Sequence, residues 1–220
     1  QMVEVAYEIR DKASYIVGSE ESPPDRGYFY NRLMQNLTES PEQSPRTFAS
    51  FIAQDTLAAY GSDPDPIFSI TQSVLEASQV GALAPALNQL GASLSAAQPA
   101  WATQIANARR GAENYGYIEN RDLTDFLNNL APVGGTPTVN DAGVLASIQG
   151  VRTALGTTII TNANGSGHPR SRGLAIYLPS PSQYIATEEA QEDGYGQPYR
   201  ALSFTKAAPA WRNFLQTGPR

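Results

Sequence analysis

The first 21 residues, QMVEVAYEIRDKASYIVGSEE, constrain the fold of this chain most, because they read as a helix that leads directly into a strand. Met2, Val5 and Ile9 recur at helical spacing, and residues 15–17 are β-formers that Gly18 closes. No N-cap residue precedes the helix, so we expect an upstream segment to begin it. A helix followed by a strand is the second half of a β-α-β unit, which predicts an α/β fold with a mainly parallel sheet and a further strand upstream.

Helical spacing dominates the rest of the chain, with a few short strands. Helices are expected over residues 28–38, 46–60, 99–112, 121–130, 141–155 and 206–216, and over a stripe that begins near Ser78. Pro85 and Gly91 interrupt that stripe and predict a kink or two shorter helices. Strands are expected at residues 67–71, 157–161 and 174–178. We therefore expect two parts, residues 1–72 as an α/β core and residues 73–220 as a helical region that adds strands to the sheet.

Charge and composition exclude several classes of partner. The net charge of −6 argues against nucleic acid, whose binding needs a clustered basic face. No apolar run approaches the ~18 residues of a membrane span, so no membrane partner is expected. The chain has no cysteine, which rules out disulfides and thiolate metal sites within it.

Four segments carry a resemblance to a known family. They are MVEVAYEIRD with YIVGSEE near the start, DLTDF at residues 122–126, GLAIYLP at 173–179, and the closing pattern Tyr195, Tyr199, Leu202, Phe204, Trp211, Phe214 and Leu215. Together they resemble the clostripain-like cysteine peptidases, relatives of caspases, gingipains and legumain, over nearly all 220 residues.

The resemblance implies the C-terminal portion of a caspase-like α/β sandwich, of which residues 1–72 complete the peptidase core. It places the nucleophilic cysteine a few residues before Gln1, in an Asp-Ala-Cys-Leu-Met type motif, and the catalytic histidine further upstream. It also implies cleavage of peptides or proteins after Arg or Lys, a secreted or cell-envelope location, and, in some relatives, a response to calcium. No other cofactor is expected.

Composition agrees with that placement of the catalytic residues. Thiol catalysis needs a thiolate and usually a histidine to take its proton, and this chain has no cysteine and one histidine. We therefore expect the chain alone to be inactive and its main partner to be the upstream segment that carries both groups. The alternative is a non-catalytic binding or scaffolding module derived from such a peptidase.

Glu20, Glu21 and Asp25 are the candidate substrate-binding residues. They lie in the loop after the first strand, and ligands of open α/β sheets bind beyond the carboxyl ends of the strands. A carboxylate in a pocket there would select Arg or Lys, because a desolvated guanidinium needs a paired acceptor. The alternative is that all three are solvated. Residues 27–30, GYFY, stand where the family commonly has Gly-Trp-Pro-Tyr, so the resemblance aligns Asp25 only to within a residue or two.

The single histidine, His168, lies in a loop of Gly, Ser, Pro and Arg residues. In the family the catalytic histidine precedes the cysteine, so we expect His168 to be a solvated loop residue rather than a base. Arg170 and Arg172 are expected to be surface charges of the same loop.

Two acidic groups could supply oxygen ligands to calcium: Asp63 with Asp65, and Asn120 with Asp122 and Asp125. Neither has the spacing of an EF-hand loop, and no metal site is predicted. Asp122 is more simply interpreted as a negative charge at a helix N-terminus, where the helix dipole favours it.

Overall fold

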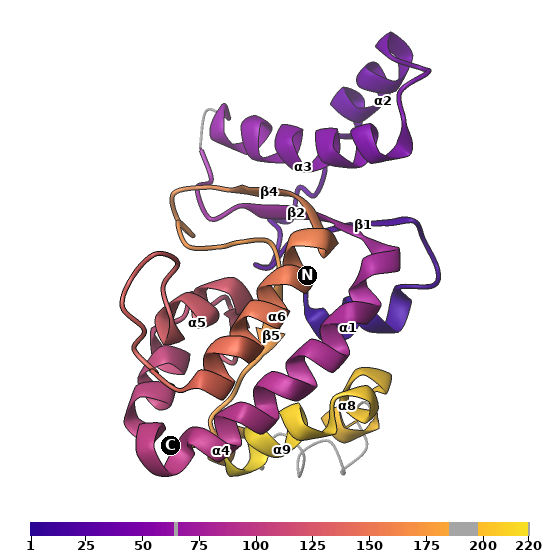
Figure 1. The fold of residues 1–220 in the computed structure, drawn as a ribbon. Coiled ribbons are helices and arrows are strands. Elements are labelled where there is room, and N and C mark those ends of the chain that lie inside the picture. The colour runs from indigo at the N-terminus through magenta and orange to yellow at the C-terminus, as the bar shows by residue number, and fades with distance from the viewer. Residues whose placement is uncertain (64–65, 185–197, 220) are drawn as a thin grey trace.

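Two small antiparallel sheets organise the chain, whose computed structural model describes residues 1–63, 66–184 and 198–219 (Figure 1). The larger has the order β1-β2-β4 and is made of β1 (Tyr15–Gly18), β2 (Thr71–Glu76) and β4 (Ile159–Asn164). The smaller pairs β3 (Asn120–Asp122) with β5 (Ala175–Tyr177). Asp65 and Tyr195, which the sequence singles out, lie outside the described residues.

Helices make up most of the remaining described chain. They are α1 (Val3–Ile9), α2 (Tyr30–Glu39), α3 (Pro45–Gly61), α4 (Leu83–Gly111), α5 (Leu123–Leu130), α6 (Ala142–Thr158), α8 (Ser203–Ala207) and α9 (Pro209–Thr217), with short 3-10 turns at η1 (Ala77–Ala82) and η2 (Tyr199–Ala201). Figure 1 shows α3 on one side of the larger sheet, with α1, α4 and α6 on the other, and α2 projecting from the end of α3. The α/β class is therefore confirmed.

The expected mainly parallel sheet is wrong for the described strands. β1 pairs antiparallel with β2, and β2 antiparallel with β4. The reason is that α2 and α3 return the chain to the end of the sheet that it left, so Gly18 at the end of β1 pairs with Ser73 near the start of β2. A parallel contact is found, among the described residues, in an isolated bridge between Met2 and Ala175, where the Ala175 N–H donates to the Gln1 carbonyl at 3.0 Å.

The two faces of the larger sheet are buried against different helices, because successive side chains of a strand point to opposite faces. Val74 packs with Ala49 and Ala53 of α3, whereas Leu75 and Ile16 belong to the main core on the other side. That core is formed largely by α4, α5, α6 and the closing helices, and it holds Trp211 with none of its surface exposed. Core packing of this tryptophan, rather than a ligand contact, follows from its burial.

Long helical stripes were predicted well, but their interruptions were not. α4 runs through Pro85 and Gly91 as helix, and its non-helical residue is Trp101, two residues after Pro99. Gly91 is a packing position, because a Cβ there would lie 2.5 Å from the Trp211 Cα of α9. The expected boundary between residues 72 and 73 falls within β2, and the division into two parts stays a prediction.

Two expected strands are displaced along the chain. The strand predicted at residues 67–71 begins only at Thr71, and α6 absorbs Thr157 and Thr158 before β4 begins at Ile159. β-branched residues favour strands only weakly, and burial on α6, where Thr158 is fully enclosed, outweighs that preference.

The Glu4 side chain is buried at the start of α1. Glu4 is 4% exposed, and its Oε1 accepts hydrogen bonds from Tyr199 Oη at 2.9 Å and from the Tyr177 N–H at 3.1 Å. Burial raises the pKa of Glu4 to about 7, although these donors oppose the shift. Glu4 thus links α1, β5 and the closing segment. Because its pKa is raised, the stability of the folded chain depends on the protonation of this side chain.

Glu4→Gln is expected to flatten the pH dependence of stability. Between the ordinary pKa of a glutamate and about 7, the unfolded chain loses the proton and the folded chain keeps it, so the folded state loses stability as pH rises through that window. At pH 8 the amide should raise the unfolding free energy by about 2 kcal/mol, allowing ~1.4 kcal/mol per pKa unit and discounting for its unpaired N–H groups. Urea denaturation at pH 5 and pH 8 measures this.

Glu8→Gln is the matched control, since Glu8 follows Glu4 by one turn and also binds the closing segment. Burial raises its pKa slightly, but hydrogen bonds from Ser203 and Phe204 outweigh burial and lower it. Its replacement should therefore bring no gain at pH 8. Equal behaviour of the two variants would contradict the role given to Glu4.

Candidate functional site

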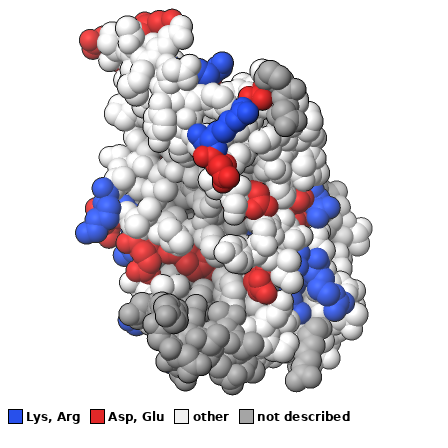
Figure 2. All heavy atoms as spheres, turned by 180° about the vertical axis from the view of Figure 1, so that it is seen from behind, with Lys and Arg blue, Asp and Glu red and all other residues white. Residues whose placement is uncertain are grey.

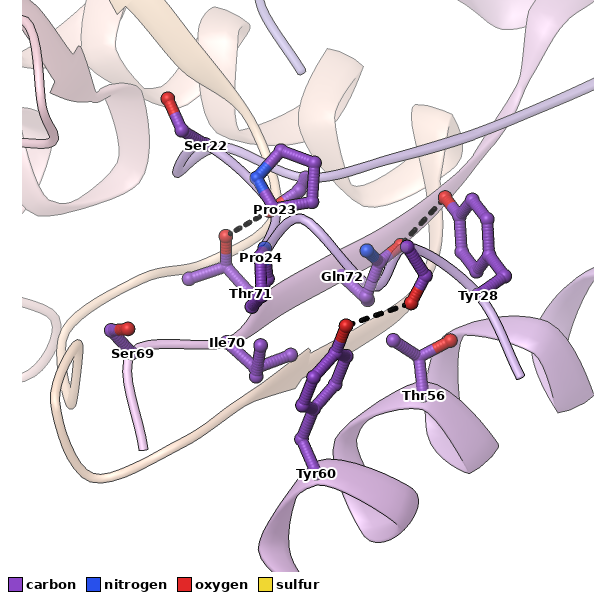
Figure 3. A pocket seen from close by; sticks show the side chains of 12 residues that line it. Ser22, Pro23, Pro24, Tyr28, Thr56, Tyr60, Ser69, Ile70, Thr71 and Gln72 are labelled. Carbon is purple, nitrogen blue, oxygen red and sulfur yellow. Dashed lines mark hydrogen bonds between the residues drawn. The ribbon is translucent and has the colours of Figure 1, made fainter. Parts of the chain in front are cut away.

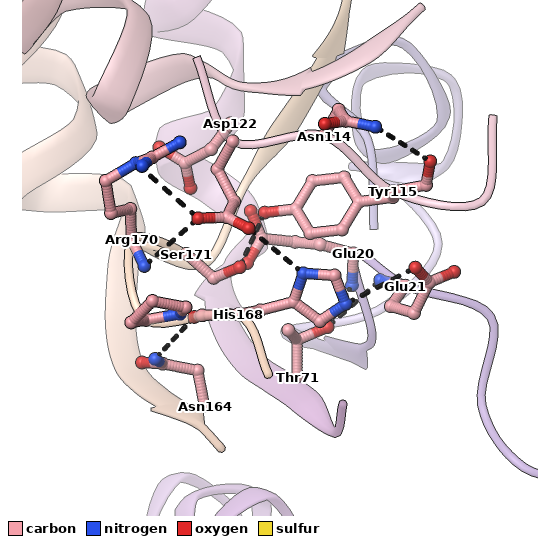
Figure 4. Close-up of polar contacts among 12 residues, drawn as sticks. Glu20, Glu21, Thr71, Asn114, Tyr115, Asp122, Asn164, His168, Arg170 and Ser171 are labelled. Atoms are coloured by element: carbon pink, nitrogen blue, oxygen red, sulfur yellow. Dashed lines mark hydrogen bonds and ion pairs between the residues drawn. The ribbon is translucent and has the colours of Figure 1, made fainter. Parts of the chain in front are cut away.

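Three loops far apart in the sequence meet at one edge of the molecule (Figure 4). They are the loop after β1, the connection from α4 to β3, and the loop between β4 and β5. Thr71, at the start of β2, fixes the first of them: its Oγ1 accepts the N–H groups of Glu20 and Glu21, each at 3.0 Å, and bonds Ser19 Oγ at 2.9 Å. The acidic loop thus begins in a fixed position above the sheet.

Glu20 is part of a buried carboxyl pair rather than an open pocket. It is 7% exposed and accepts the Gly173 N–H at 3.0 Å, while the side chain of Asp122, fully buried, shares a hydrogen bond with it. Burial, and then the charge of Glu20, hold the pKa of Asp122 well above its ordinary value. Glu20 and Asp122 thus form a buried pair of carboxyl groups that share a hydrogen bond.

Asp122 also organises the backbone around it. As the N-cap of α5 it accepts the Asp125 N–H at 2.6 Å, so the expected position at a helix N-terminus is confirmed, although the raised pKa speaks against the expected negative charge. Its other oxygen accepts the Arg172 N–H at 2.5 Å. Gly173 has a φ of +99°, a conformation that glycine adopts without strain, and this lets its N–H reach Glu20. The pair thus joins all three loops.

Glu21 is held by His168. His168 Nε2 lies 3.4 Å from Glu21 Oε2, and Nδ1 lies 3.2 Å from Glu113 Oε1. Glu21 also accepts the N–H groups of Gly116, at 3.0 and 3.1 Å, and of Ser22 at 2.6 Å. The two ring nitrogens of His168 thus face two carboxylates that come from different loops.

The expectation of a solvated loop histidine is wrong. The His168 side chain is 12% exposed, and its ring packs against Tyr115 with the centroids 5.2 Å apart. Arg170 is also more than a surface charge, because its Nε lies 3.0 Å from Asp125 Oδ2 and 3.6 Å from Glu113 Oε2. The sequence around His168 predicts a solvated loop because the loop itself is polar. The residues that His168 and Arg170 contact lie some 45 to 150 residues away in the sequence, so the local pattern does not indicate them.

Asp25 is placed differently from the two glutamates. It is exposed at the outer part of the loop, and within the described residues it has no hydrogen bond or ion pair. The neighbouring Arg26 pairs with Asp63 instead. Of the three candidate carboxylates, Asp25 is therefore the one whose acceptor oxygens are uncommitted.

A small cavity lies beneath this loop (Figure 3). Its volume is about 50 Å³, and its wall includes Pro24, Tyr60 and Thr71. The loop is closed over it by hydrogen bonds from Tyr60 Oη to the Gly27 carbonyl at 2.8 Å and from Tyr28 Oη to Gln72 at 3.3 Å. Small-molecule pockets hold roughly 300–1,000 Å³, so the cavity has room for a few water molecules only.

Gln1 lies where these loops converge on the sheet. Its amino group donates to the Ser19 carbonyl at the end of β1, and its carbonyl accepts from Ala175 of β5. Gln1 and Met2 thus run between the edge strands of the two sheets, next to the loops that carry Glu20 and Gly173.

The described residues contain no group of three or more His, Cys, Asp or Glu side chains that could hold a metal ion. Asn120, Asp122 and Asp125 do not form one, because Asp122 caps α5 and Asp125 binds the Glu113 N–H and Arg170. Over the same parts of the chain, the helices include none with the length and apolar character needed to cross a membrane.

Figure 2 shows acidic and basic side chains interspersed on one face of the molecule. Asp and Glu side chains lie mainly across the middle, and Lys and Arg side chains lie at the left and right edges and above the middle. The sequence indicates that Glu20 and Glu21 share the loop after β1, as the structure shows. It does not indicate Thr71, Glu113 and Tyr115, which hold this loop and His168 in position. Nothing in their local sequence indicates these roles, since each contact is made across the fold.

Comparison with known proteins gives one sequence family and several related structures. The sequence model of the clostripain family matches residues 1–217. Curated protein sequences give no match. Among solved structures, an inactive zymogen protease from Parabacteroides distasonis superposes with a TM-score of 0.62 at 18% identity, covering 94% of this chain and 55% of that one.

Two further structures agree with it. A cysteine protease from B. fragilis has a TM-score of 0.63 at 18% identity, with 98% of this chain and 84% of that one covered. A secreted cysteine protease from Bacteroides thetaiotaomicron, in complex with an irreversible peptide inhibitor, has a TM-score of 0.62 at 17% identity, with 97% and 56% covered. This chain therefore spans about half the length of two of the three proteins, with which it shares the fold.

Proposed function

The chain belongs to the clostripain family, a family of cysteine peptidases, and on that premise we propose that it is the substrate-pocket and scaffold part of an endopeptidase that cleaves after Arg or Lys. The observation that carries the proposal is chemical: the 220 residues contain no cysteine, and the one histidine is bound between two carboxylates. The thiolate and its proton acceptor would come from a segment that precedes Gln1.

The position of Gln1 supports this arrangement. It lies between β1 and β5, beside the loops of the candidate site. A strand that leads into Gln1 would continue the parallel contact with β5 and deliver its last residues to this edge. The nucleophile would then attack the scissile carbonyl close to the acidic loop, with the histidine of that segment managing the protons.

Within this site we assign recognition of the basic side chain to Asp25. Glu20 and Glu21, the other candidates, already serve Asp122, Gly173, His168 and Gly116, and act as scaffold. The cavity beneath the loop is too small for an arginine, so the substrate would lie on the outer side of the loop. The B. thetaiotaomicron protease binds a peptide inhibitor, which supports a peptide substrate for this chain. That protease is secreted, which supports an exported enzyme here as well. No cofactor is proposed.

The isolated 220-residue chain is expected not to hydrolyse fluorogenic peptides that end in Arg or Lys. Addition of the upstream segment should restore turnover that a thiol reagent abolishes. Turnover by the chain alone that His168→Ala removes would contradict the assignment.

The second candidate function is a non-catalytic binding module, which the absence of cysteine favours equally. Binding of such peptides without cleavage by the complete protein would establish it instead.

A further inference from the structure

Three arginines line an open cavity away from the site described above. Arg109 and Arg110 come from the end of α4 and Arg121 from β3, and the cavity between them has a volume of about 390 Å³. Arg121 and Asp122 are neighbours on one strand, so their side chains point to opposite faces. The cavity therefore lies across the β3–β5 ladder from the buried carboxyl pair.

Within residues 1–63, 66–184 and 198–219, no carboxylate lies within ion-pair distance of the three guanidinium groups, so nothing in this part of the chain balances their positive charge by an ion pair. Their hydrogen bonds go to neutral oxygens: Arg109 to the Pro219 carbonyl at 2.8 Å, Arg121 to the Ala112 carbonyl at 2.8 Å, and Arg110 to Asn107. Arg121 Nε is buried and has no partner.

The arginines also act on one another. Burial, and then the positive charges of Arg110 and Arg121, lower the pKa of Arg109. Burial also lowers the pKa of Arg121, and the charge of Glu119 opposes that shift without an ion pair, since its carboxylate accepts a hydrogen bond from Gln183 at 3.0 Å. Assembling three guanidinium groups without an acid costs free energy, and an anion in the cavity would recover it.

The walls of the cavity indicate what kind of anion fits. Ile118, 54% exposed, provides apolar surface, while Ser182 and Gln183 add polar groups at the rim. A guanidinium binds carboxylates through two parallel N–H donors. Since Ile118 would contact a carbon skeleton but would gain nothing from an inorganic ion, we propose that this pocket binds an organic carboxylate, either the acidic side chains of a peptide or a small polycarboxylic acid.

The test uses the full chain and isothermal titration calorimetry at fixed ionic strength. The probes are end-blocked tetraglutamate, tricarballylate and sulfate. We expect both carboxylates to bind more tightly than sulfate, and the tighter of the two identifies a peptide or a small acid as the source. Absence of carboxylate binding, or sulfate binding as tight as theirs, would overturn the proposal.

Variants locate the binding in the cavity. Arg110→Glu, at an exposed residue whose change should leave the fold intact, is expected to weaken carboxylate binding at least tenfold, and Arg121→Gln to weaken it similarly. Arg152→Gln is the matched control, because Arg152 is partly buried and binds Asn128 and the Ala131 carbonyl outside the cavity. Unchanged affinity in Arg110→Glu, or an equal loss in Arg152→Gln, would contradict the site. The result does not depend on the peptidase proposal.

Discussion

Replacing Asp122 with Ala is expected to lower the free energy of unfolding by about 3–5 kcal/mol, because a buried carboxyl group with three hydrogen-bond partners is lost and each partner left unsatisfied costs ~1–3 kcal/mol. Glu20 would lose the hydrogen bond that it shares with Asp122, and the N–H groups of Asp125 and Arg172 would lose their acceptors. Urea denaturation at pH 7 measures the loss. Asp122→Asn should retain part of the stability, because an amide can still donate to Glu20.

Asp141→Ala is the control for the capping contribution. Asp141 caps α6 by accepting the Val144 N–H at 3.0 Å, but it has no buried carboxyl partner. Its loss should cost only ~1 kcal/mol, as is typical of an N-cap. If the two alanine variants lose the same amount, Asp122 is a helix cap and not the centre of the three-loop junction.

In the complete enzyme, Asp25→Asn is expected to lower kcat/KM for Arg and Lys substrates about thirtyfold or more. The physical reason is that binding desolvates the basic side chain of the substrate, which in the variant no longer finds a charged acceptor. The loss of one partner of such a pair costs ~2–5 kcal/mol. Substrates with a neutral residue at the same position should be cleaved at unchanged rates. The measurement is kcat/KM for matched peptides that differ only at this residue.

Asp11→Asn serves as the control, since Asp11 is a carboxylate 78% exposed at the end of α1 and paired with Arg10. It should leave both classes of substrate unaffected. An equal loss on basic and neutral substrates in Asp25→Asn would mean that the loop has been disturbed, and no loss on either would remove Asp25 from the site.

Local pattern predicted the elements of this fold better than their connections. The apolar spacing was sufficient to predict the helices α3, α5 and α6. Each of them buries one face in a core, and the spacing that this burial requires does not depend on which element packs against the helix. Strand direction was not predictable from β1 and β2 themselves. It depends on where α2 and α3 return the chain, which is a property of the whole layer.

The candidate site shows the same division. The acidic loop after β1 was predicted from adjacent residues, but the distinction among its carboxylates was not. The Glu20 carboxyl group is hydrogen-bonded to Asp122, about 100 residues further on, and the Glu21 carboxylate contacts His168, about 150 residues further on. Neither is therefore available to a substrate. His168 looked solvated because its neighbours in sequence are polar, whereas its neighbours in space are Tyr115, Glu21 and Glu113.

In the proposed enzyme this chain holds the substrate while a preceding segment performs the chemistry. The most direct test is to treat the complete protein with a thiol-reactive peptide probe that ends in Lys and to map the modified residue by mass spectrometry. The account predicts a single adduct on a cysteine upstream of Gln1, formed more slowly in Asp25→Asn and at an unchanged rate in Asp11→Asn. An activity-abolishing adduct on any residue between 1 and 220, His168 included, would contradict it.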